Sequence, residues 1–364
     1  MGPRILILSA SIGEGHDLPA RMLADGIAAA APDADVIVLD GLRAMGRFAT
    51  TLAEDGATTV LHRADRVHDA AYYLLSRWPP SRAGAKAFTH RIGSRGLLAL
   101  IAEQQPDVIV STYPGVTEAL GHLRAHGRIT VPVCSAITDL AALHYWAHPG
   151  VDLHLTIHPE SRAEILSIAP KAEILCVRGL TMPRFEQPTD ASASRLRLGL
   201  AQRGPVVVVS GGGWAVGDLA GATEVALADQ ARATVLALCG RSETIKAALE
   251  ARFDGEPRVQ VMGFTDQMPD VLGAADVLVH STAGLTVLEA LICGCRVISY
   301  GWGVAHIRLN NAAYERFGLV EVAAGRDALA GALRAALASP GAVDAGYALR
   351  PSAAHAVLRL AVRS

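Results

Sequence analysis

Short apolar runs alternate along the first half of the chain with longer stretches in which apolar residues recur at helical spacing. This alternation predicts a parallel, doubly wound α/β sheet. The predicted strands are Arg4–Leu8, Asp35–Leu39, Val108–Ser111, Val131–Ile137, Leu153–Ile157 and Ile174–Cys176. The predicted helices fill Leu18–Ala30, much of Asp40–Ser76, Ala85–Glu103 and Gly115–Ala125.

A second series of the same kind follows a stretch that is richer in Pro, Gln, Thr and Ser, at residues 181–203. We interpret that stretch as a linker. The fold class is therefore α/β with two Rossmann-like doubly wound domains, and ligands are expected in the cleft between them, at the carboxyl ends of the strands. The expected parts are residues 1–180, the linker 181–203, residues 204–340, and a C-terminal helical segment 341–364 that crosses back to the first domain. The second set of strands is Val206–Ser210, Thr234–Cys239, Val259–Met262, Val277–Val279, Arg296–Tyr300 and Val320–Val322.

Composition narrows the class of protein. The 364 residues carry a formal net charge of −2 and no sustained basic tract with aromatics, which argues against nucleic-acid binding. The five cysteines are scattered and odd in number, so we expect a reducing, cytoplasmic setting without a disulfide framework. Cys293 and Cys295 are not accompanied by a second pair of metal-binding residues, so no metal site is predicted.

We find no signal-peptide pattern and no apolar run of the ~18 residues of a membrane span. Membrane contact, if any, is expected to be peripheral.

The stretch from Phe264 to Asn311 carries most information about function. An apolar run at Val277–Val279 ends in small residues at Ser281–Gly284, and a helix is predicted to begin near Leu285. The free N–H groups and positive dipole end of such a helix suit an anion such as a diphosphate. Glu289, one turn into this helix, is spaced to accept hydrogen bonds from ribose hydroxyls.

Three more loops follow predicted strands and contain glycine. Gly13 and Gly15 stand beside His16 after the first strand, Gly211–Gly213 follows the strand at Val206, and Arg241 follows Gly240. Glycine lets a backbone approach a ligand closely. Each loop also has a simpler interpretation, as an ordinary strand-to-helix turn with a surface side chain.

Asp139 stands where the apolar strand Val131–Ile137 ends, at the edge where such folds keep their chemistry. A partly desolvated carboxylate there is able to take a proton from a hydroxyl nucleophile. The alternative is that Asp139 caps the following turn. His144 and Trp146, a few residues on, are candidates for ligand contact or for packing around the loop.

Together these motifs resemble glycosyltransferase family 28, whose architecture is GT-B. The resemblance is greatest to monogalactosyldiacylglycerol synthase and the processive diacylglycerol glucosyltransferases. It spans nearly the whole chain, and it rests on the order of the motifs across two domains. They are Gly13-Glu-Gly-His16, Thr138-Asp-Leu with His144-x-Trp146, Arg178-Gly-Leu-Thr-Met-Pro-Arg-Phe185, Gly211-Gly-Gly213, Cys239-Gly-Arg241, Gly263-Phe264, Gly284-x-Thr286-x-x-Glu289-Ala290 and His306 with Asn310.

The resemblance implies an inverting transferase that moves a hexose or N-acetylhexosamine from a UDP-sugar to a hydroxyl of a diacylglycerol-like lipid, without a metal or other cofactor. Asp139 is the leading candidate for the general base, with His16 beside it. Acceptor contacts would come from Gly13, Gly15, His144 and Trp146. The nucleotide-sugar contacts implied are Gly211, Gly212, Gly213, Arg241, Phe264, Met268, His280, Ser281, Gly284, Thr286, Glu289, His306 and Asn310.

The chain departs from the pattern near the sugar. The segment that is Lys-Ala-Gly-Pro-Gly-Thr in the lipid galactosyltransferases is His280-Ser-Thr-Ala-Gly-Leu-Thr here, and the Gly-Gln-Glu triplet before the final Asn is replaced by Ala305-His-Ile. These departures leave the sugar identity open. They also leave open a small-molecule acceptor or a nucleotide-sugar-binding protein without turnover. A non-hydrolysing UDP-sugar 2-epimerase shares the architecture, but Thr138-Asp-Leu with His144-x-Trp146 argues against it.

Ala70–Ala102 contains Arg77, Arg82, Lys86, Arg91 and Arg95 and no acidic residue, and these cations are interleaved with Trp78, Phe88, Ile92 and Leu97. A basic amphipathic stretch of this kind is able to lie on anionic headgroups, so peripheral attachment to the inner face of the cell membrane is expected. A solvated helix face explains the same pattern equally well.

Overall fold

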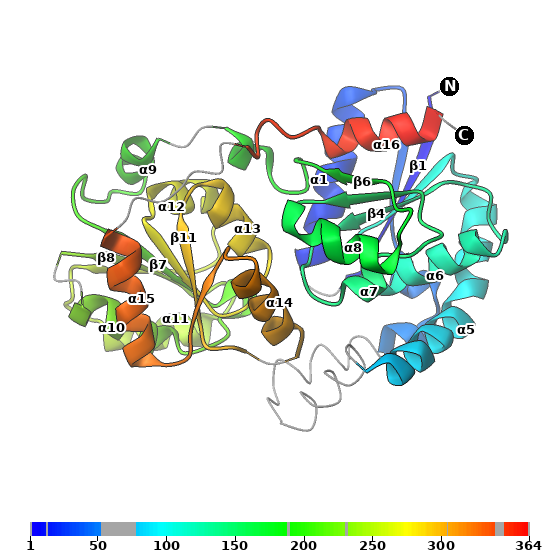
Figure 1. Cartoon of the computed structure of the whole chain (residues 1–364). Helices are drawn as coiled ribbons and strands as arrows, with labels where there is room; N and C mark the ends of the chain where they lie inside the picture. The colour runs from blue at the N-terminus through cyan, green and yellow to red at the C-terminus, as the bar shows by residue number, and fades with distance from the viewer. Residues whose placement is uncertain are drawn as a thin grey trace. The chain divides into compact units, whose positions relative to one another are not determined.

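The computed structural model describes residues 2–11, 14–51, 78–187, 190–229, 232–303, 305–338 and 346–362. The chain divides into two compact units, of which the first comprises residues 1–183 with 348–364 and the second residues 184–347 (Figure 1). Every predicted strand is present within two residues at each end, since uninterrupted apolar runs mark strands that are covered on both faces.

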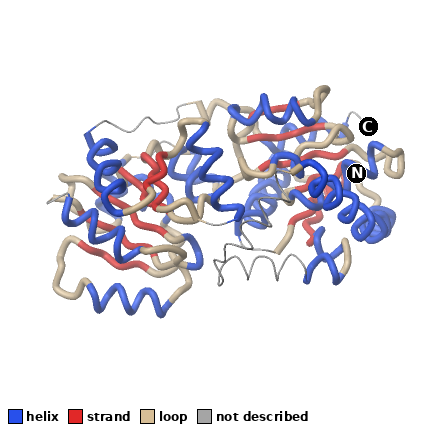
Figure 2. The backbone as a smooth tube through the Cα atoms, turned by 60° about the horizontal axis from the view of Figure 1, so that its bottom comes forward, coloured by secondary structure: helices blue, strands red, loops and turns tan. Residues whose placement is uncertain are grey.

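The first unit is built on a six-stranded parallel sheet in the order β2-β1-β3-β4-β5-β6. The order reverses between β1 and β3, which makes the carboxyl ends of these two strands the switch point where α/β sheets bind ligands. The strands, drawn in red in Figure 2, are β1 Arg4–Ser9, β2 Asp35–Asp40, β3 Val108–Ser111, β4 Val133–Ile137, β5 Leu153–Thr156 and β6 Ile174–Cys176.

Helices cover this sheet, and α1 and α16 pack against each other although they lie at opposite ends of the chain. The bounds are α1 Glu14–Ala30, α2 Gly41–Ala44, α5 Pro79–Gln104, α6 Pro114–Ala125, α7 Leu143–Trp146, η1 Pro159–Ser161, α8 Arg162–Ile168 and α16 Ala353–Val362. Helix α1 begins at Glu14, ahead of the start predicted at Leu18, and carries Pro19 inside it. Pro19 lacks the N–H group that would otherwise donate to the Gly15 carbonyl, so one internal hydrogen bond is missing in the second turn.

The second unit has a parallel sheet in the order β12-β11-β10-β7-β8-β9, with its switch point between β7 and β10. Its strands are β7 Val206–Ser210, β8 Thr234–Leu238, β9 Val259–Met262, β10 Val277–His280, β11 Arg296–Tyr300 and β12 Glu321–Ala323. Its helices are η2 Pro183–Glu186, α9 Ala191–Arg197, η3 Gly212–Trp214, α10 Leu219–Asp229, α11 Glu243–Arg252, α12 Met268–Ala274, α13 Leu285–Ile292, α14 Ala305–Arg316 and α15 Arg326–Ala338.

Much of the segment that the sequence presents as a linker is helical and packed on the second unit. Helix α9 lies on α12. The buried carboxylate of Asp270 accepts hydrogen bonds from Arg184 at 3.0 Å and from Arg197 at 2.8 Å. These two ion pairs fasten η2 and α9 to α12.

The end of the chain is tied to the first unit by backbone contacts. The N–H of Ala353 donates to the carbonyl of Arg178 at 3.0 Å, and Arg178 forms a parallel bridge with Ser352. Among the described residues no helix is long and apolar enough to cross a membrane.

Candidate functional site

The loops at the carboxyl edge of the second sheet are held together by backbone contacts between glycines. A Cβ atom on Gly240 would lie 2.5 Å from the carbonyl oxygens of Gly212 and Gly213, and Gly240 has a φ of +53°. The N–H of Arg241 donates to the Gly213 carbonyl at 2.9 Å. The loops after β7 and β8 therefore form one surface, in which only glycine fits at position 240.

The loop after β10 closes the same edge. A Cβ atom on Gly217 would lie 2.5 Å from the Ser281 Oγ, so this loop also packs closely on the segment after β7. Gly284 directly precedes α13 and has no side chain with which to cap it. The first N–H groups of α13 thus lie at the edge where Gly211–Gly213 ends, an arrangement that suits an anion such as a diphosphate.

Arg241 lies over the ring of Phe264 at this edge. The Arg241 guanidinium carbon lies 3.8 Å from the centroid of the Phe264 ring, and Phe264 is 57% exposed although it is aromatic. Planar cations stack on aromatic faces, and an exposed stacked pair offers a surface for a nucleobase. The structure thus brings together two residues that the sequence connects only by their positions after neighbouring strands.

His280 lies inside this edge and not on its surface. It is 1% exposed, and burial lowers its pKa to about 4. Its Nε2 atom lies 2.7 Å from the Thr282 Oγ1, so the neutral imidazole positions that hydroxyl. Thr282, which also lies against Gly212, belongs to the Ser281–Gly284 turn that the sequence places before the helix.

The remaining predicted donor-site residues differ in accessibility. Glu289 on α13 and Asn310 on α14 are 5% and 2% exposed, so any ligand contact has to come from a small exposed part of each. His306, near the start of α14, is exposed. Met268 begins α12, and Thr286 lies in the first turn of α13, both half-buried.

We expect Glu289→Ala to weaken UDP binding by roughly 1.5–3 kcal/mol, the range for hydrogen bonds to a charged group. The reason is that Glu289 lies one turn into the helix whose N-terminus follows the glycine edge. Isothermal calorimetry with UDP measures this, and Glu289→Gln, which keeps the side-chain volume, shows whether the loss comes from charge or from packing. Unchanged affinity in both variants would contradict a ribose contact.

A second group of side chains gathers at the carboxyl edge of the first sheet. The ring of His16, in the first turn of α1, lies edge-on to Tyr113 with centroids 5.1 Å apart and 6.0 Å from the ring of Trp146. The Thr112 hydroxyl donates to the His16 carbonyl at 3.1 Å. Segments after β1, β3 and β4 thus meet at His16, as the switch-point rule predicts.

Asp139 follows β4 at the same edge and is half-buried. Its negative charge is felt by Tyr113, whose pKa is raised to about 12 chiefly by burial and further by Asp40 and Asp139. The two candidates for the general base, Asp139 and His16, therefore share Tyr113 as a neighbour. The sequence interpretation missed Tyr113, although it follows a predicted strand directly.

The predicted acceptor contacts divide into three cases. Gly15 is exposed, whereas Gly13 lies outside the described residues. Trp146 is completely buried and supports His16 from within the core. His144 is half-buried, and its pKa is lowered by burial and then by Arg82 and Lys86, which places it towards α5.

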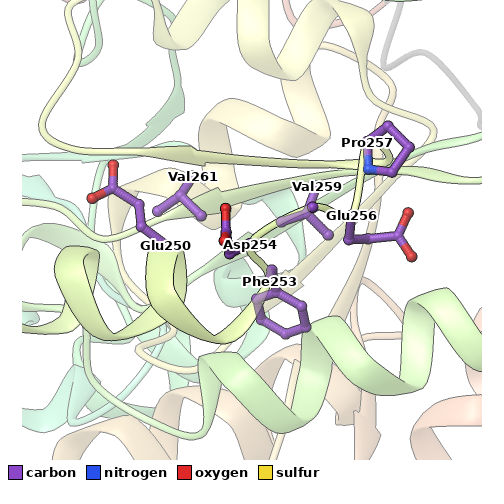
Figure 3. Close-up of a pocket in the computed structure, with 8 residues that line it drawn as sticks. Glu250, Phe253, Asp254, Glu256, Pro257, Val259 and Val261 are labelled. Carbon is purple, nitrogen blue, oxygen red and sulfur yellow. The ribbon is translucent and has the colours of Figure 1, made fainter.

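A pocket of about 430 Å³ opens elsewhere in the second unit, between α11 and β9 (Figure 3). The apolar part of its lining is Phe253, Val259 and Val261. Two of the acidic residues at its rim are paired, Glu250 with Lys246 and Glu256 with Arg258. The pocket lies at the amino-terminal part of β9, away from the glycine edge, so it is separate from the candidate nucleotide site.

Similar solved structures extend over the full chain. Acinetobacter baumannii MurG superimposes with a TM-score of 0.58 and 14% identity, covering 100% of both chains. Arabidopsis thaliana UGT89C1, solved in complex with UDP, gives a TM-score of 0.56 and 15% identity over 99% of both chains. Together with the two parallel sheets, these similarities define the fold class as GT-B, with two Rossmann-like domains.

Two family models match the chain. Residues 19–181 match "Monogalactosyldiacylglycerol (MGDG) synthase" and residues 215–339 match "Glycosyl transferases group 1". Residues 19–181 are thus similar to the MGDG synthase family and residues 215–339 to a glycosyltransferase family, in agreement with the resemblance inferred from the motifs.

Curated relatives agree with this assignment. The processive diacylglycerol β-glucosyltransferase of Staphylococcus epidermidis is 23% identical over 208 residues, which is 57% of this chain and 53% of that protein. The enzyme of the same name from Bacillus subtilis is 24% identical over 214 residues, 58% of this chain and 55% of that protein. The match therefore spans about half the length of these relatives.

Proposed function

We propose that the protein is an inverting glycosyltransferase that moves a hexose or N-acetylhexosamine from a UDP-sugar to a hydroxyl of a diacylglycerol-like lipid. The MGDG synthase domain and the names of the curated relatives support the lipid acceptor. The UDP complex of a structural neighbour supports the donor. The observation that carries the donor site is the edge formed by Gly212, Gly213 and Gly240 next to the start of α13.

In the proposed reaction the acceptor oxygen attacks the anomeric carbon while the bond from that carbon to UDP breaks. Asp139 takes the proton from the acceptor hydroxyl as the new bond forms. The helix N-terminus of α13 and the backbone N–H groups of the glycine edge offset the charge of the departing diphosphate. The proposed step needs no metal. The proton goes to Asp139, the sugar goes to the acceptor oxygen, and UDP leaves.

The test is to incubate the protein with UDP-glucose, UDP-galactose or UDP-N-acetylglucosamine and vesicles containing diacylglycerol. Release of UDP together with a glycolipid in mass spectrometry, unchanged by EDTA, is expected. Release that depends on a soluble acceptor would indicate a small-molecule transferase. Thermal stabilisation by donors without release would indicate a binding protein, since a ligand at ~100 times its Kd stabilises a fold by roughly 2.7 kcal/mol.

We further propose that the first unit docks on anionic membranes. Residues 70–77 of the basic stretch lie outside the described residues. In the described part, apolar residues occur on several sides of α5: Leu97 and Ile101 are buried, whereas Phe88 is exposed. The apolar residues of α5 therefore do not form one exposed face. The proposed membrane contact is restricted to a patch in which the exposed rings of Phe48 and Phe88 lie 5.9 Å apart.

Charge reversal at Arg91 and Arg95, both exposed on α5, is expected to release the protein from phosphatidylglycerol vesicles at low salt. Lys86 is unsuitable because its ammonium group pairs with the buried Glu118 at 2.7 Å. Co-sedimentation at rising salt measures the effect. A matched control changes the same charge at Arg128 and Lys171, which are exposed elsewhere in the first unit. If the wild-type protein never co-sediments, a soluble acceptor becomes the better proposal.

A further inference from the structure

The side chain of Tyr113 is held by its own part of the chain. Its N–H donates to the Ser111 Oγ at 3.3 Å, and that hydroxyl accepts from the Thr117 Oγ1 at 2.9 Å. A Cβ atom on Gly115 would lie 3.2 Å from the Tyr113 Cε1, so the absence of a side chain there leaves room for the ring over the start of α6. The hydrogen bonds hold the Tyr113 backbone, Gly115 leaves room for the ring, and neither involves the Tyr113 hydroxyl.

The ring of Tyr113 meets His16 from one side while Trp146 lies on another. The Tyr113 and His16 planes are 87° apart, which is the edge-to-face geometry that aromatic rings prefer. Trp146 is fully buried, and the backbone of His16 is held by Thr112. The Nδ1 atom of His16 is itself buried, and no described residue hydrogen-bonds it. Its imidazole is therefore oriented by ring contacts and not by a hydrogen bond at Nδ1.

The hydroxyl of Tyr113 is available to a ligand. None of the described residues hydrogen-bonds it, and burial together with Asp40 and Asp139 keeps its pKa near 12, so it remains protonated at neutral pH. A phenol that stays un-ionised beside two carboxylates is able to donate a hydrogen bond to an incoming hydroxyl.

We propose that Tyr113 is a positioning residue of the acceptor site, whose ring orients the His16 imidazole and whose hydroxyl hydrogen-bonds an acceptor hydroxyl. The inference rests on the proposed transferase function for its kinetic consequences, but the orientation of His16 is testable without activity. Two substitutions distinguish the role of the hydroxyl from the role of the ring. Tyr113→Phe removes only the hydroxyl, whereas Tyr113→Leu removes the aromatic ring as well.

For kinetics we expect Tyr113→Phe to raise the acceptor KM by about fivefold with little change in kcat, as for the loss of one neutral hydrogen bond. Tyr113→Leu is expected to lower kcat by roughly 10–100-fold, because a misplaced group near the reacting atoms loses its alignment. The donor KM should stay unchanged in both. Equal kinetics for Tyr113→Leu and the wild type would overturn the proposal.

The readout that needs no activity is NMR of protein labelled in its histidines, with the His16 signal assigned by its loss in His16→Gln. Tyr113→Leu should move that signal, whereas Tyr113→Phe should leave it near the wild-type position. An unmoved His16 signal in Tyr113→Leu overturns the positioning role even if the variant is slow. If the wild-type protein transfers no sugar, the transferase proposal fails, while the NMR comparison still decides whether Tyr113 positions His16.

Discussion

Replacing Asp139 by asparagine is expected to lower kcat by roughly 10²–10⁴-fold, the usual effect of removing a general base. Asp139 follows β4, a strand buried along its whole length, at the edge where His16 and Tyr113 meet. Asparagine keeps the shape of the side chain but cannot accept the proton. Because the donor contacts lie in the second unit, UDP affinity should be unchanged in calorimetry.

The control for this variant is Asp33→Asn, which changes an exposed carboxylate in the same unit and should leave turnover unaffected. His16→Ala is expected to impair acceptor use at least as visibly as the chemical step. Near-normal turnover of Asp139→Asn would transfer the role to His16 or remove it from both residues. The sequence interpretation left Asp139 and His16 as alternatives, and this pair of variants distinguishes them.

The fold could be predicted from the sequence because its strands are continuous apolar runs and its turns carry glycine. The glycine loops could be found because each of them follows a predicted strand. Glycine is required at position 240 because the backbone there lies close to the carbonyls of Gly212 and Gly213. Which glycines contact one another depends on strand order, and the β7-β8 pairing joins segments that local periodicity does not connect.

Burial of single side chains could not be predicted in the same way. His280 and Trp146 have the residue types of ligand contacts, but both lie inside the protein, because strand ends and short helices bury one side of a loop. Lys86 looked like a free surface cation, yet it pairs with Glu118, 32 residues away. Tyr113 has no motif, and only its position directly after β3 could have indicated it.

The described part of the first unit contains several histidines that are buried in their neutral form. The pKa of His154 is lowered to about 4 chiefly by burial, and that of His158 to about 4 by burial and then by Arg350. The His148 N–H approaches the His154 Nε2 at 3.3 Å, a contact that suits the unprotonated nitrogen. His148 also has a pKa lowered to about 4, again chiefly by burial.

The lowered pKa values of these histidines determine how the stability of the first unit changes with pH. In the unfolded chain each histidine binds a proton near pH 6.5, whereas in the folded chain these groups bind one only near pH 4. Below pH 6.5 the unfolded state therefore holds more protons, and stability is lost as the pH falls towards 4. For His154 and His158 the loss at pH 5 is on the order of 2 kcal/mol each.

We therefore expect the first unit to lose thermal stability between pH 6.5 and 5, before most carboxylates titrate, and to do so ahead of the second unit. Hydrogen exchange followed by peptide at pH 7.5, 6 and 5 assigns the loss to one unit. His154→Gln should reduce the acid sensitivity, because glutamine stays neutral, even if it lowers stability at pH 7.5. His355→Gln, at an exposed position of α16 in the same unit, should leave the pH dependence as it is. An acid transition unchanged by His154→Gln would mean that carboxylates, and not the buried imidazoles, determine the acid stability of this unit.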